Sequence, residues 1–194
     1  MKLVIIDYGA GNTQSVKFAF QRLGMAPVLS SDKDEILSAD KIIFLGVGHA
    51  KAAMEVLKEK KLDVLIPQLK QPVLGICLGM QLLCKHSEEG DTECLNVFDA
   101  DVKLFEPKLK VPHIGWNDTM GLHSKNGSVW NFNKDYFYFV HSYYVPVNDF
   151  TSAICNYVTD FSAAIQKNNF YAVQFHPEKS GAAGEQLLKQ FLSI

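Results

Sequence analysis

Short apolar runs alternate with amphipathic stretches along the first half of the chain. The runs LVIID, PVLS, KIIFLG and PVLGI are rich in β-branched residues, which is typical of buried strands. Between them, apolar residues recur at helical spacing over 13–23 before Gly24, and further helices are expected near 33–39 and over 50–70. This alternation predicts an α/β fold of the doubly wound kind, in which helices cover both faces of a mostly parallel sheet.

The second half of the chain has a different pattern. A helix is expected from Cys77 to about Lys85, followed by a polar loop, SEEGDTE. Extra, partly antiparallel strands are expected near 95–105, 127–132, 135–140, 153–158 and 161–166. Asn126-Gly127 is typical of a hairpin turn, and the chain closes with a strand in YAVQFHPE and an amphipathic helix over 182–192. We therefore expect a three-layer sandwich that forms one domain over residues 1–194.

The composition limits the kinds of partner. The chain has 194 residues, 47% of them hydrophobic, which is enough for one full core. A formal net charge of −2, with no run of Lys or Arg, argues against binding to nucleic acid or to an anionic membrane. The apolar run in MKLVIIDYG is too short for a signal peptide or a membrane span, so a cytoplasmic location is expected.

The cysteines and histidines do not form a metal-binding pattern. Cys77, Cys84, Cys94 and Cys155 lack the CxxC spacing of metal sites and the density of a secreted disulfide scaffold, so we interpret them as reduced thiols. The histidines lack the paired helical spacing of zinc enzymes. No metal site is expected.

The sequence GICLG lies between an apolar run and a predicted helix. It is the cysteine counterpart of the nucleophile elbow, in which a strand turns sharply into a helix. Gly75 and Gly79 remove the Cβ atoms that would clash there, and the helix N-terminus would favour a thiolate at Cys77. The backbone N–H of Leu78 could then face an oxyanion. The alternative is a buried core cysteine without chemistry.

The motif QFHPEKS can supply a base and a group that orients it. Pro177 stiffens the turn, so that His176 and Glu178 can point into the same site. Glu178 can accept a hydrogen bond from one imidazole nitrogen, which leaves the other nitrogen to take a thiol proton. Taken alone, the motif slightly favours a polar loop histidine that has no catalytic role.

Two further turns follow predicted strands and are rich in glycine. In GVGH, the backbone of Gly46, Val47 and Gly48 can present a second oxyanion donor, or it can form an ordinary strand-to-helix turn. DYGAGNTQ is similar to the dinucleotide fingerprint, with Asp32 at a suitable distance, but Gln14 replaces the third glycine. An anion or partner contact at this helix N-terminus is therefore the preferred interpretation, and no cofactor is expected.

The elbow, the HPE turn and the GVG turn occur in the chain order of the class I glutamine amidotransferases. The sequence resembles this family over nearly its whole length, through DYGAGNTQSV, GVGH, GICLGMQLL, VPHIGWN, YFVHSYY and QFHPEKS. The resemblance implies a catalytic triad of Cys77, His176 and Glu178. In the implied reaction, the Cys77 thiolate attacks the carboxamide of glutamine, His176 protonates the departing ammonia, and water hydrolyses the resulting thioester to glutamate.

The resemblance also implies roles for residues around this triad. The oxyanion would be met by the N–H of Leu78 and by one from the Gly46-Val47-Gly48 segment, after that segment rearranges. Substrate-holding positions of the family match Gln81, Ser142 and Tyr143.

One residue departs from the family pattern. Relatives commonly carry proline directly before the Gly-Val-Gly segment, and this chain has Leu45 there. Leucine adds a backbone N–H and more freedom in φ, so basal activity or the strength of allosteric control could differ.

Within the family, the motifs together are most similar to the glutaminase subunits of histidine biosynthesis. Those subunits pass ammonia to a (β/α)₈-barrel cyclase, which makes imidazole glycerol phosphate and an aminoimidazole carboxamide ribonucleotide. The resemblance therefore implies a heterodimer whose glutaminase is slow until the synthase binds its nucleotide substrate. Positions that face or gate the partner match Asn12, Trp116, Tyr138 and Lys179. From its surroundings in PHIGWN alone, between two predicted strands, Trp116 could equally be a core residue.

Three alternatives remain open. The first is a superfamily of thiol hydrolases, glyoxalases and chaperones that also has an elbow cysteine, but its members use an acid near the N-terminal strands and lack the HPE turn. The second is a non-catalytic scaffold subunit, and the third is a glutaminase that serves a different synthase. QFHPEKS argues against the first alternative, and the intact triad positions argue against the second.

Overall fold

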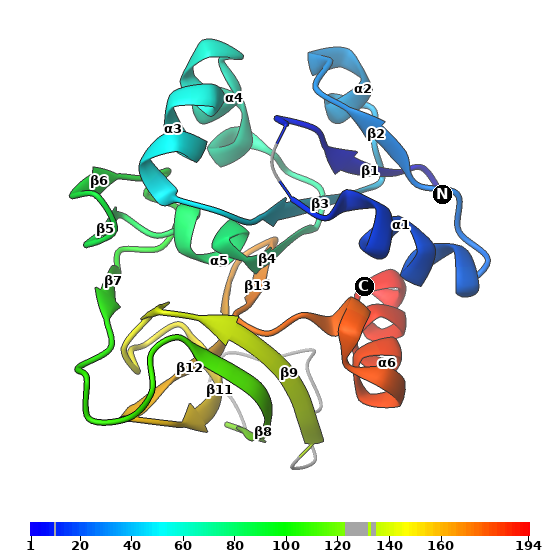
Figure 1. Ribbon diagram of the computed structural model, residues 1–194. Coiled ribbons are helices and arrows are strands. Elements are labelled where there is room, and N and C mark those ends of the chain that lie inside the picture. Colours follow the sequence, from blue (N-terminus) through cyan, green and yellow to red (C-terminus); the bar gives the residue numbers. More distant parts are fainter. Residues whose placement is uncertain (10, 123–131, 133–134) are drawn as a thin grey trace.

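The structure is a computed structural model, and it describes residues 1–9, 11–122, 132 and 135–194 (Figure 1). The strand expected near 127–132 and the Asn126-Gly127 turn fall largely outside the described residues. The helices are α1 (Thr13–Arg22), α2 (Lys33–Leu37), α3 (Ala50–Glu59), α4 (Leu62–Leu65), α5 (Leu78–Leu82) and α6 (Gly181–Ser193), with short 3₁₀ helices over Ile66–Gln68 and Pro177–Lys179. None of the described helices is long and apolar enough to cross a lipid bilayer.

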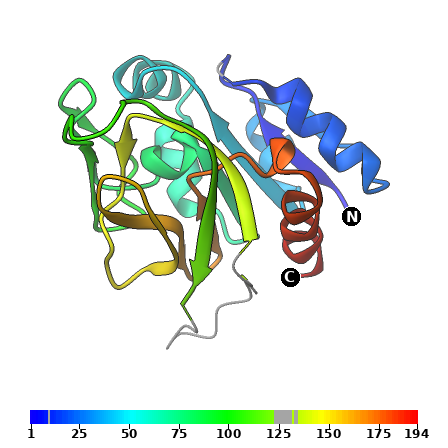
Figure 2. The same ribbon diagram turned by 60° about the horizontal axis from the view of Figure 1, so that its bottom comes forward.

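Nine strands of the described chain form one large sheet. Their spatial order is β2 (Val28–Ser30), β1 (Leu3–Ile6), β3 (Lys41–Gly46), β4 (Val73–Cys77), β13 (Phe170–Val173), β12 (Asp160–Lys167), β11 (Thr151–Asn156), β8 (His113–Gly121) and β9 (Asp135–His141). The first five strands are parallel, and the other four continue the sheet with antiparallel pairing. Figures 1 and 2 both show β8 and β9 side by side, at the far end of the sheet from β1 and β2.

A smaller sheet packs beside α5. Its order is β10 (Tyr143–Tyr144), β7 (Asp101–Leu104), β5 (His86–Ser87) and β6 (Thr92–Glu93). This sheet places the backbone of residues 142–144 close to the carboxyl end of β4, where the elbow lies.

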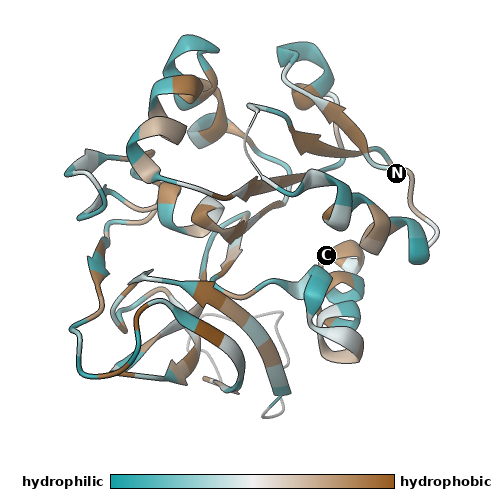
Figure 3. Cartoon of the chain, in the orientation of Figure 1, coloured by the Kyte–Doolittle hydropathy of each residue, from teal (hydrophilic) through white to brown (hydrophobic). Residues whose placement is uncertain are grey.

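The alternation of side chains along the parallel strands produces two cores, one on each face of the sheet. Val4 and Phe44 pack with the apolar side of α3, α4 and α5, whereas Ile5 and Leu45 pack with α1 and α6. Figure 3 shows hydrophobic residues concentrated along the central strands, with hydrophilic residues on the outer sides of the helices. The predicted three-layer α/β architecture is confirmed.

Several predicted boundaries differ from the observed ones for identifiable reasons. The helix after Cys77 ends at Leu82 and not at Lys85, because Leu95 and Val97 donate backbone hydrogen bonds to the carbonyl groups of Leu82 and Leu83. The SEEGDTE loop is in part a hairpin, since β5 and β6 pair around Gly90.

Other differences concern the expected strands and the long helical region. The helical region over 50–70 is broken after α3, where Lys61 takes a left-handed φ of 56°. Of the expected strand over 95–105, only Asp101–Leu104 is extended, and the strand in YAVQFHPE ends at Val173. Trp116 lies inside β8, and not between two strands.

Candidate active site

The elbow forms where β4 ends and α5 begins. Cys77 has φ 54° and ψ −112°, a conformation that a residue with a side chain adopts only when its surroundings impose it. A Cβ on Gly79 would overlap the backbone oxygen of Phe44, and one on Gly75 would lie 2.8 Å from the side chain of Leu83. Gly79 is therefore required for the close approach of α5 to the sheet, as the sequence predicted, and a side chain at Gly75 would displace Leu83.

The histidine and the carboxylate of the HPE turn are hydrogen-bonded to each other. Nδ1 of His176 lies 2.8 Å from Oε1 of Glu178, and both side chains are buried. The turn is also tied to β9, because the backbone N–H of His176 donates to the carbonyl of Tyr138. Ser180 reinforces this tie, since its hydroxyl donates to the carbonyl of His176 and accepts from the N–H of Tyr138. The imidazole ring therefore has one fixed orientation.

The surroundings of His176 favour its protonated form. Burial acts to lower the pKa of His176, but interactions with Cys77 and with the Glu178 carboxylate outweigh burial and raise it to about 10. Because Nδ1 is taken by Glu178, Nε2 is the nitrogen left for Cys77. Nε2 is buried and has no hydrogen-bond partner among the described residues. The pair can thus hold a proton next to the sulfur, which is what protonation of a leaving group requires.

A cavity of about 350 Å³ opens in front of the sulfur. Its walls combine the elbow, the GVG turn, the end of β9 with the residues after it, and the HPE turn. The lining residues are Val47, Gly48, Cys77, Leu78, Gln81, Glu89, Pro112, Val140, His141, Ser142, Tyr143, His176 and Lys179. All the predicted oxyanion and substrate positions are therefore brought to one cavity of a size suited to a small metabolite, and Glu178 lies behind His176.

The GVG turn is the exposed wall of this cavity. Val47 is 41% exposed, and Gly48 has φ 97°, which glycine adopts without strain. Leu45, the residue directly before the Gly-Val-Gly segment, is buried at the end of β3 and lies against Gly11. That the backbone N–H groups of Val47 and Gly48 receive an oxyanion stays a prediction.

The side chain of Gln81 is already engaged inside the protein. Its Nε2 donates to the carbonyl of Tyr143 at 2.9 Å and to Oε1 of Gln174 at 3.0 Å. The carbonyl of neighbouring Ser142 accepts a hydrogen bond from the N–H of Phe105. These contacts hold the three predicted substrate residues in a fixed relation to each other.

The sequence of this chain is similar to those of known proteins. The family model described as "Glutamine amidotransferase class-I" matches residues 4–194. The chain belongs to the class I glutamine amidotransferases. Two similar curated proteins are the imidazole glycerol phosphate synthase subunits HisH of Bacteroides fragilis (strain YCH46), 54% identical over 198 residues, and of Escherichia coli (strain K12), 50% identical over 196 residues. In both comparisons, all of this chain and all of the relative are covered.

Solved structures support the fold of this amidotransferase. One described as a glutamine amidotransferase superposes with a TM-score of 0.76 at 17% identity, covering 98% of this chain and 97% of that chain. At this level of identity, the likeness concerns the architecture alone.

Three of the four positions predicted to face a partner lie together on the amidotransferase. Trp116 on β8 and Tyr138 on β9 are cross-strand neighbours, with ring centroids 6.2 Å apart, and Trp116 is 56% exposed. The ammonium group of Lys179 lies 5.9 Å from the centroid of the Tyr138 ring, and Lys179 also lines the cavity. The fourth position, Asn12, accepts a hydrogen bond from Ser15 and caps α1. The exposure of Trp116 excludes the core alternative.

The amidotransferase has site residues that the sequence analysis missed. Glu89, in a segment expected to be a plain polar loop, lines the cavity and caps α3 by accepting from the N–H of Ala50 at 2.7 Å. Gln174 is fully buried next to Cys77, and His141 lines the cavity and pairs with His113 behind it. A glutamine inside an apolar strand run was the one available signal, because buried amides are uncommon.

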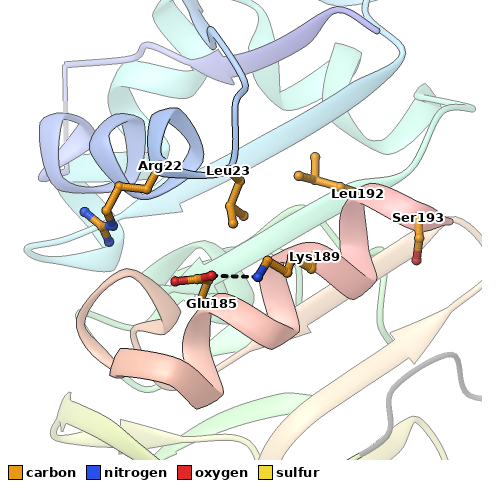
Figure 4. A pocket seen from close by; sticks show the side chains of 6 residues that line it. All are labelled: Arg22, Leu23, Glu185, Lys189, Leu192 and Ser193. Atoms are coloured by element: carbon orange, nitrogen blue, oxygen red, sulfur yellow. Dashed lines mark ion pairs between the residues drawn. The ribbon is translucent and has the colours of Figure 1, made fainter.

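A second cavity, of about 450 Å³, lies between the end of α1 and α6 (Figure 4). The ion pair Glu185–Lys189, 2.7 Å apart and one turn apart on α6, lies along its α6 wall. None of the predicted catalytic or substrate residues lines this cavity, so it does not compete with the first as the reaction site. In the described part of the chain, no cluster of three or more His, Cys, Asp and Glu is arranged to hold a metal ion.

Proposed function

We propose that the chain is the glutaminase subunit of an imidazole glycerol phosphate synthase and that Cys77, His176 and Glu178 are its catalytic residues. The observation that carries this proposal is the meeting of Cys77 and the His176–Glu178 pair at one cavity. The 54% identity to a HisH subunit over the full length supports the choice of synthase. The whole chain then acts as one amidotransferase domain in the cytoplasm.

The proposed reaction proceeds in two stages. The Cys77 sulfur attacks the carboxamide carbon of glutamine, and the proton held on His176 passes to the leaving nitrogen, which departs as ammonia. Water then attacks the thioester, with neutral His176 as general base, and glutamate leaves. The N–H of Leu78 and one from the Val47–Gly48 segment stabilise the oxyanion in each stage. Gln81, Ser142 and Tyr143 hold the substrate.

The proposed partner is a (β/α)₈-barrel cyclase that consumes the ammonia in a heterodimer with this chain. It would dock over Trp116, Tyr138 and Lys179, with Asn12 as a further contact. Large exposed side chains surround this position on β8 and β9, namely Ile114, Met120 and Tyr136. An exposed tryptophan within an apolar patch is a typical anchor of a protein interface.

The packing near Leu45 suggests how partner binding would reach the oxyanion turn. Leu45 and Gly46 precede that turn, and Leu45 lies against Gly11, one residue before the proposed contact Asn12. Movement of the loop after β1 would therefore displace the end of β3 through this contact. Leucine in place of the family's proline affects the strength of this coupling.

The test is release of glutamate from glutamine by the purified chain, alone and with the cyclase subunit plus its ribonucleotide substrate. We expect slow release alone and an increase of roughly 10²–10³-fold in the full mixture, which is what one properly placed oxyanion donor supplies. Cys77→Ala should abolish both activities, whereas the matched control Cys94→Ala should keep them. Fast release that ignores the cyclase would contradict the proposed partner, and activity in Cys77→Ala would contradict the proposed nucleophile.

A further inference from the structure

Gln174 occupies a buried position beside the nucleophile. It directly follows β13, whose last paired residue, Val173, lies opposite Ile76 of β4, so Gln174 is the neighbour of Cys77 across the sheet. Its side chain is fully buried, and its backbone N–H donates to the carbonyl of Ala163 at 2.9 Å. A primary amide at this depth must find partners, because burial of an unpaired amide is costly.

Hydrogen bonds fix which way the amide of Gln174 points. The carbonyl of Tyr143 can only accept, so the atom of Gln81 that contacts it at 2.9 Å must be the amide nitrogen. The same nitrogen lies 3.0 Å from the side chain of Gln174, which must therefore present its oxygen. The NH₂ group of Gln174 consequently points to the sulfur of Cys77, at a distance of 3.9 Å.

A buried histidine extends this network on the other side of the same carbonyl. Nδ1 of His141 lies 2.7 Å from the carbonyl of Tyr143 and must carry its proton, so Nε2 of His141 accepts. Nδ1 of His113 is 3.1 Å from that Nε2 and therefore donates to it. The Tyr143 carbonyl, in the cavity wall, is thus held by two donors, and one of them connects it to the nucleophile.

We propose that Gln174 is a positioning residue for the glutaminase reaction, which donates a hydrogen bond to the Cys77 thiolate and links it through Gln81 to the substrate wall at Tyr143. An N–H donor gains strength when the sulfur is ionised, because charge-assisted hydrogen bonds are shorter and roughly twice as strong. The amide therefore stabilises the thiolate and keeps the sulfur in front of the cavity. This inference rests on the proposed role of Cys77 as the nucleophile.

The experiment compares Gln174→Met with the matched control Gln166→Met. Methionine has a similar length and cannot donate. Gln166 is a half-buried residue of the neighbouring strand β12, away from the cavity, and its Oε1 is buried. The rate at which iodoacetamide alkylates Cys77 is measured from pH 5 to 10 by mass spectrometry of the Cys77 peptide. The other ionisable groups around Cys77 and its cavity are the same in both variants: Tyr8, Glu89, His141, Tyr143, His176, Glu178 and Lys179.

We expect Gln174→Met to slow alkylation of Cys77 about tenfold near pH 7, to shift the alkylation profile toward higher pH, and to lower kcat for glutamine about tenfold. Gln166→Met should match the parent chain in all three measurements. If Gln174→Met does not fold, Gln174→Asn withdraws the amide by one methylene and should shift the profile in the same direction. An alkylation profile that coincides with that of the parent in a folded Gln174 variant would overturn the inference.

The outcome also separates this inference from the proposed function. Alkylation reports on the sulfur directly and does not require turnover. If Cys77→Ala abolishes glutaminase activity while the Gln174 variants keep the parent alkylation profile, only the inference fails. If Cys77→Ala remains active, the proposed nucleophile fails, whatever the alkylation of the Gln174 variants shows.

Discussion

One buried histidine, His176, and one buried histidine pair, His113 and His141, lie close to the same cavity. The single histidine and the pair differ in charge. His176 lies beside a carboxylate, and its pKa is raised to about 10 by Cys77 and Glu178 against the effect of burial. His113 and His141 instead contact each other and aromatic rings, among them Tyr157, whose ring centroid is 4.0 Å from that of His113. Burial lowers the pKa of His113 to about 4 and that of His141 to about 3.

The difference shows that the neighbours of a histidine decide its chemical role. His176 has an anionic acceptor at Nδ1, so a proton on the ring is stabilised and is available for transfer. His141 has a backbone carbonyl at Nδ1 and the N–H of His113 at Nε2, so the neutral ring satisfies both of its nitrogens. In the proposed reaction the first site moves a proton, while the second holds the Tyr143 carbonyl in the cavity wall.

Removal of the carboxylate that charges His176 should give the largest effect. We expect Glu178→Gln to lower kcat for glutamine by on the order of 10³–10⁴-fold, because the amide still accepts a hydrogen bond but no longer stabilises the imidazolium. Glutamate release in the presence of the cyclase measures this change. The matched control Glu185→Gln alters an exposed ion pair of the second cavity and should leave kcat within twofold. Equal losses in both variants would contradict the triad role of Glu178.

A change in the neutral pair should affect stability before it affects chemistry. His113→Leu leaves Nε2 of His141 as a buried acceptor without its donor, so we expect a loss of about 1–3 kcal/mol in the free energy of unfolding. Urea denaturation measures this loss. As a control, His86→Leu breaks only a solvent-exposed contact with Asp91 and should cost less than about 0.5 kcal/mol. Similar costs at the two positions would show that the buried pair is not structural.

The single histidine and the pair should also give pH dependences of opposite sign. His113 and His141 have lower pKa values in the folded chain than the ordinary 6.5, so the unfolded chain binds more protons. Their contribution to stability is lost as the pH falls from about 6.5 to about 4 for His113 and to about 3 for His141. His176 has a raised pKa, so its contribution is full below pH 6.5 and is lost as the pH rises toward 10.

Thermal denaturation across this pH range checks the signs. We expect His113→Leu to flatten the decline of Tm on the acid side and to leave the alkaline side unchanged, since it removes one titrating group of the neutral pair. If both sides change equally, the pH dependence does not arise from separate histidine sites.

These histidines also show which parts of the site could be predicted from sequence. Gly75, Cys77 and Gly79 lie within five residues, so one short motif contains the residues on which the sharp turn depends. His176 and Glu178 were found for the same reason, since one rigid turn carries both. Local motifs therefore predicted residues that the structure brings to one cavity, and the roles of Cys77 as nucleophile and His176 as base stay predictions.

The remainder of the site depends on strand register, which single motifs do not contain. His113 and His141 are 28 residues apart, and they meet only because β8 and β9 pair antiparallel with these two residues opposite each other. The same register places Trp116 next to Tyr138. Gln174 reaches Cys77 through the parallel pairing of β13 with β4, and no spacing in the sequence indicates that contact.

Tyr8 differs from both histidine sites because it is a buried polar group without a hydrogen-bond partner among the described residues. Its substitution should give the smallest of the expected effects. Its hydroxyl is buried and has no hydrogen-bond partner among the described residues, and burial together with Cys77 holds its pKa well above the usual range. Because an unpaired buried hydroxyl destabilises the fold, Tyr8→Phe should raise the free energy of unfolding, by about 1 kcal/mol.

The matched change Tyr157→Phe should have the opposite sign. The hydroxyl of Tyr157 donates to the carbonyl of Lys110 at 2.7 Å, so its removal should lower the free energy of unfolding by about 1 kcal/mol. Urea denaturation of both variants gives the two values under the same conditions. A loss of stability in Tyr8→Phe would mean that the hydroxyl has a partner in solution. Since a Cβ on Gly46 would lie 2.7 Å from that hydroxyl, the end of β3 before the oxyanion turn would be the first place to look for it.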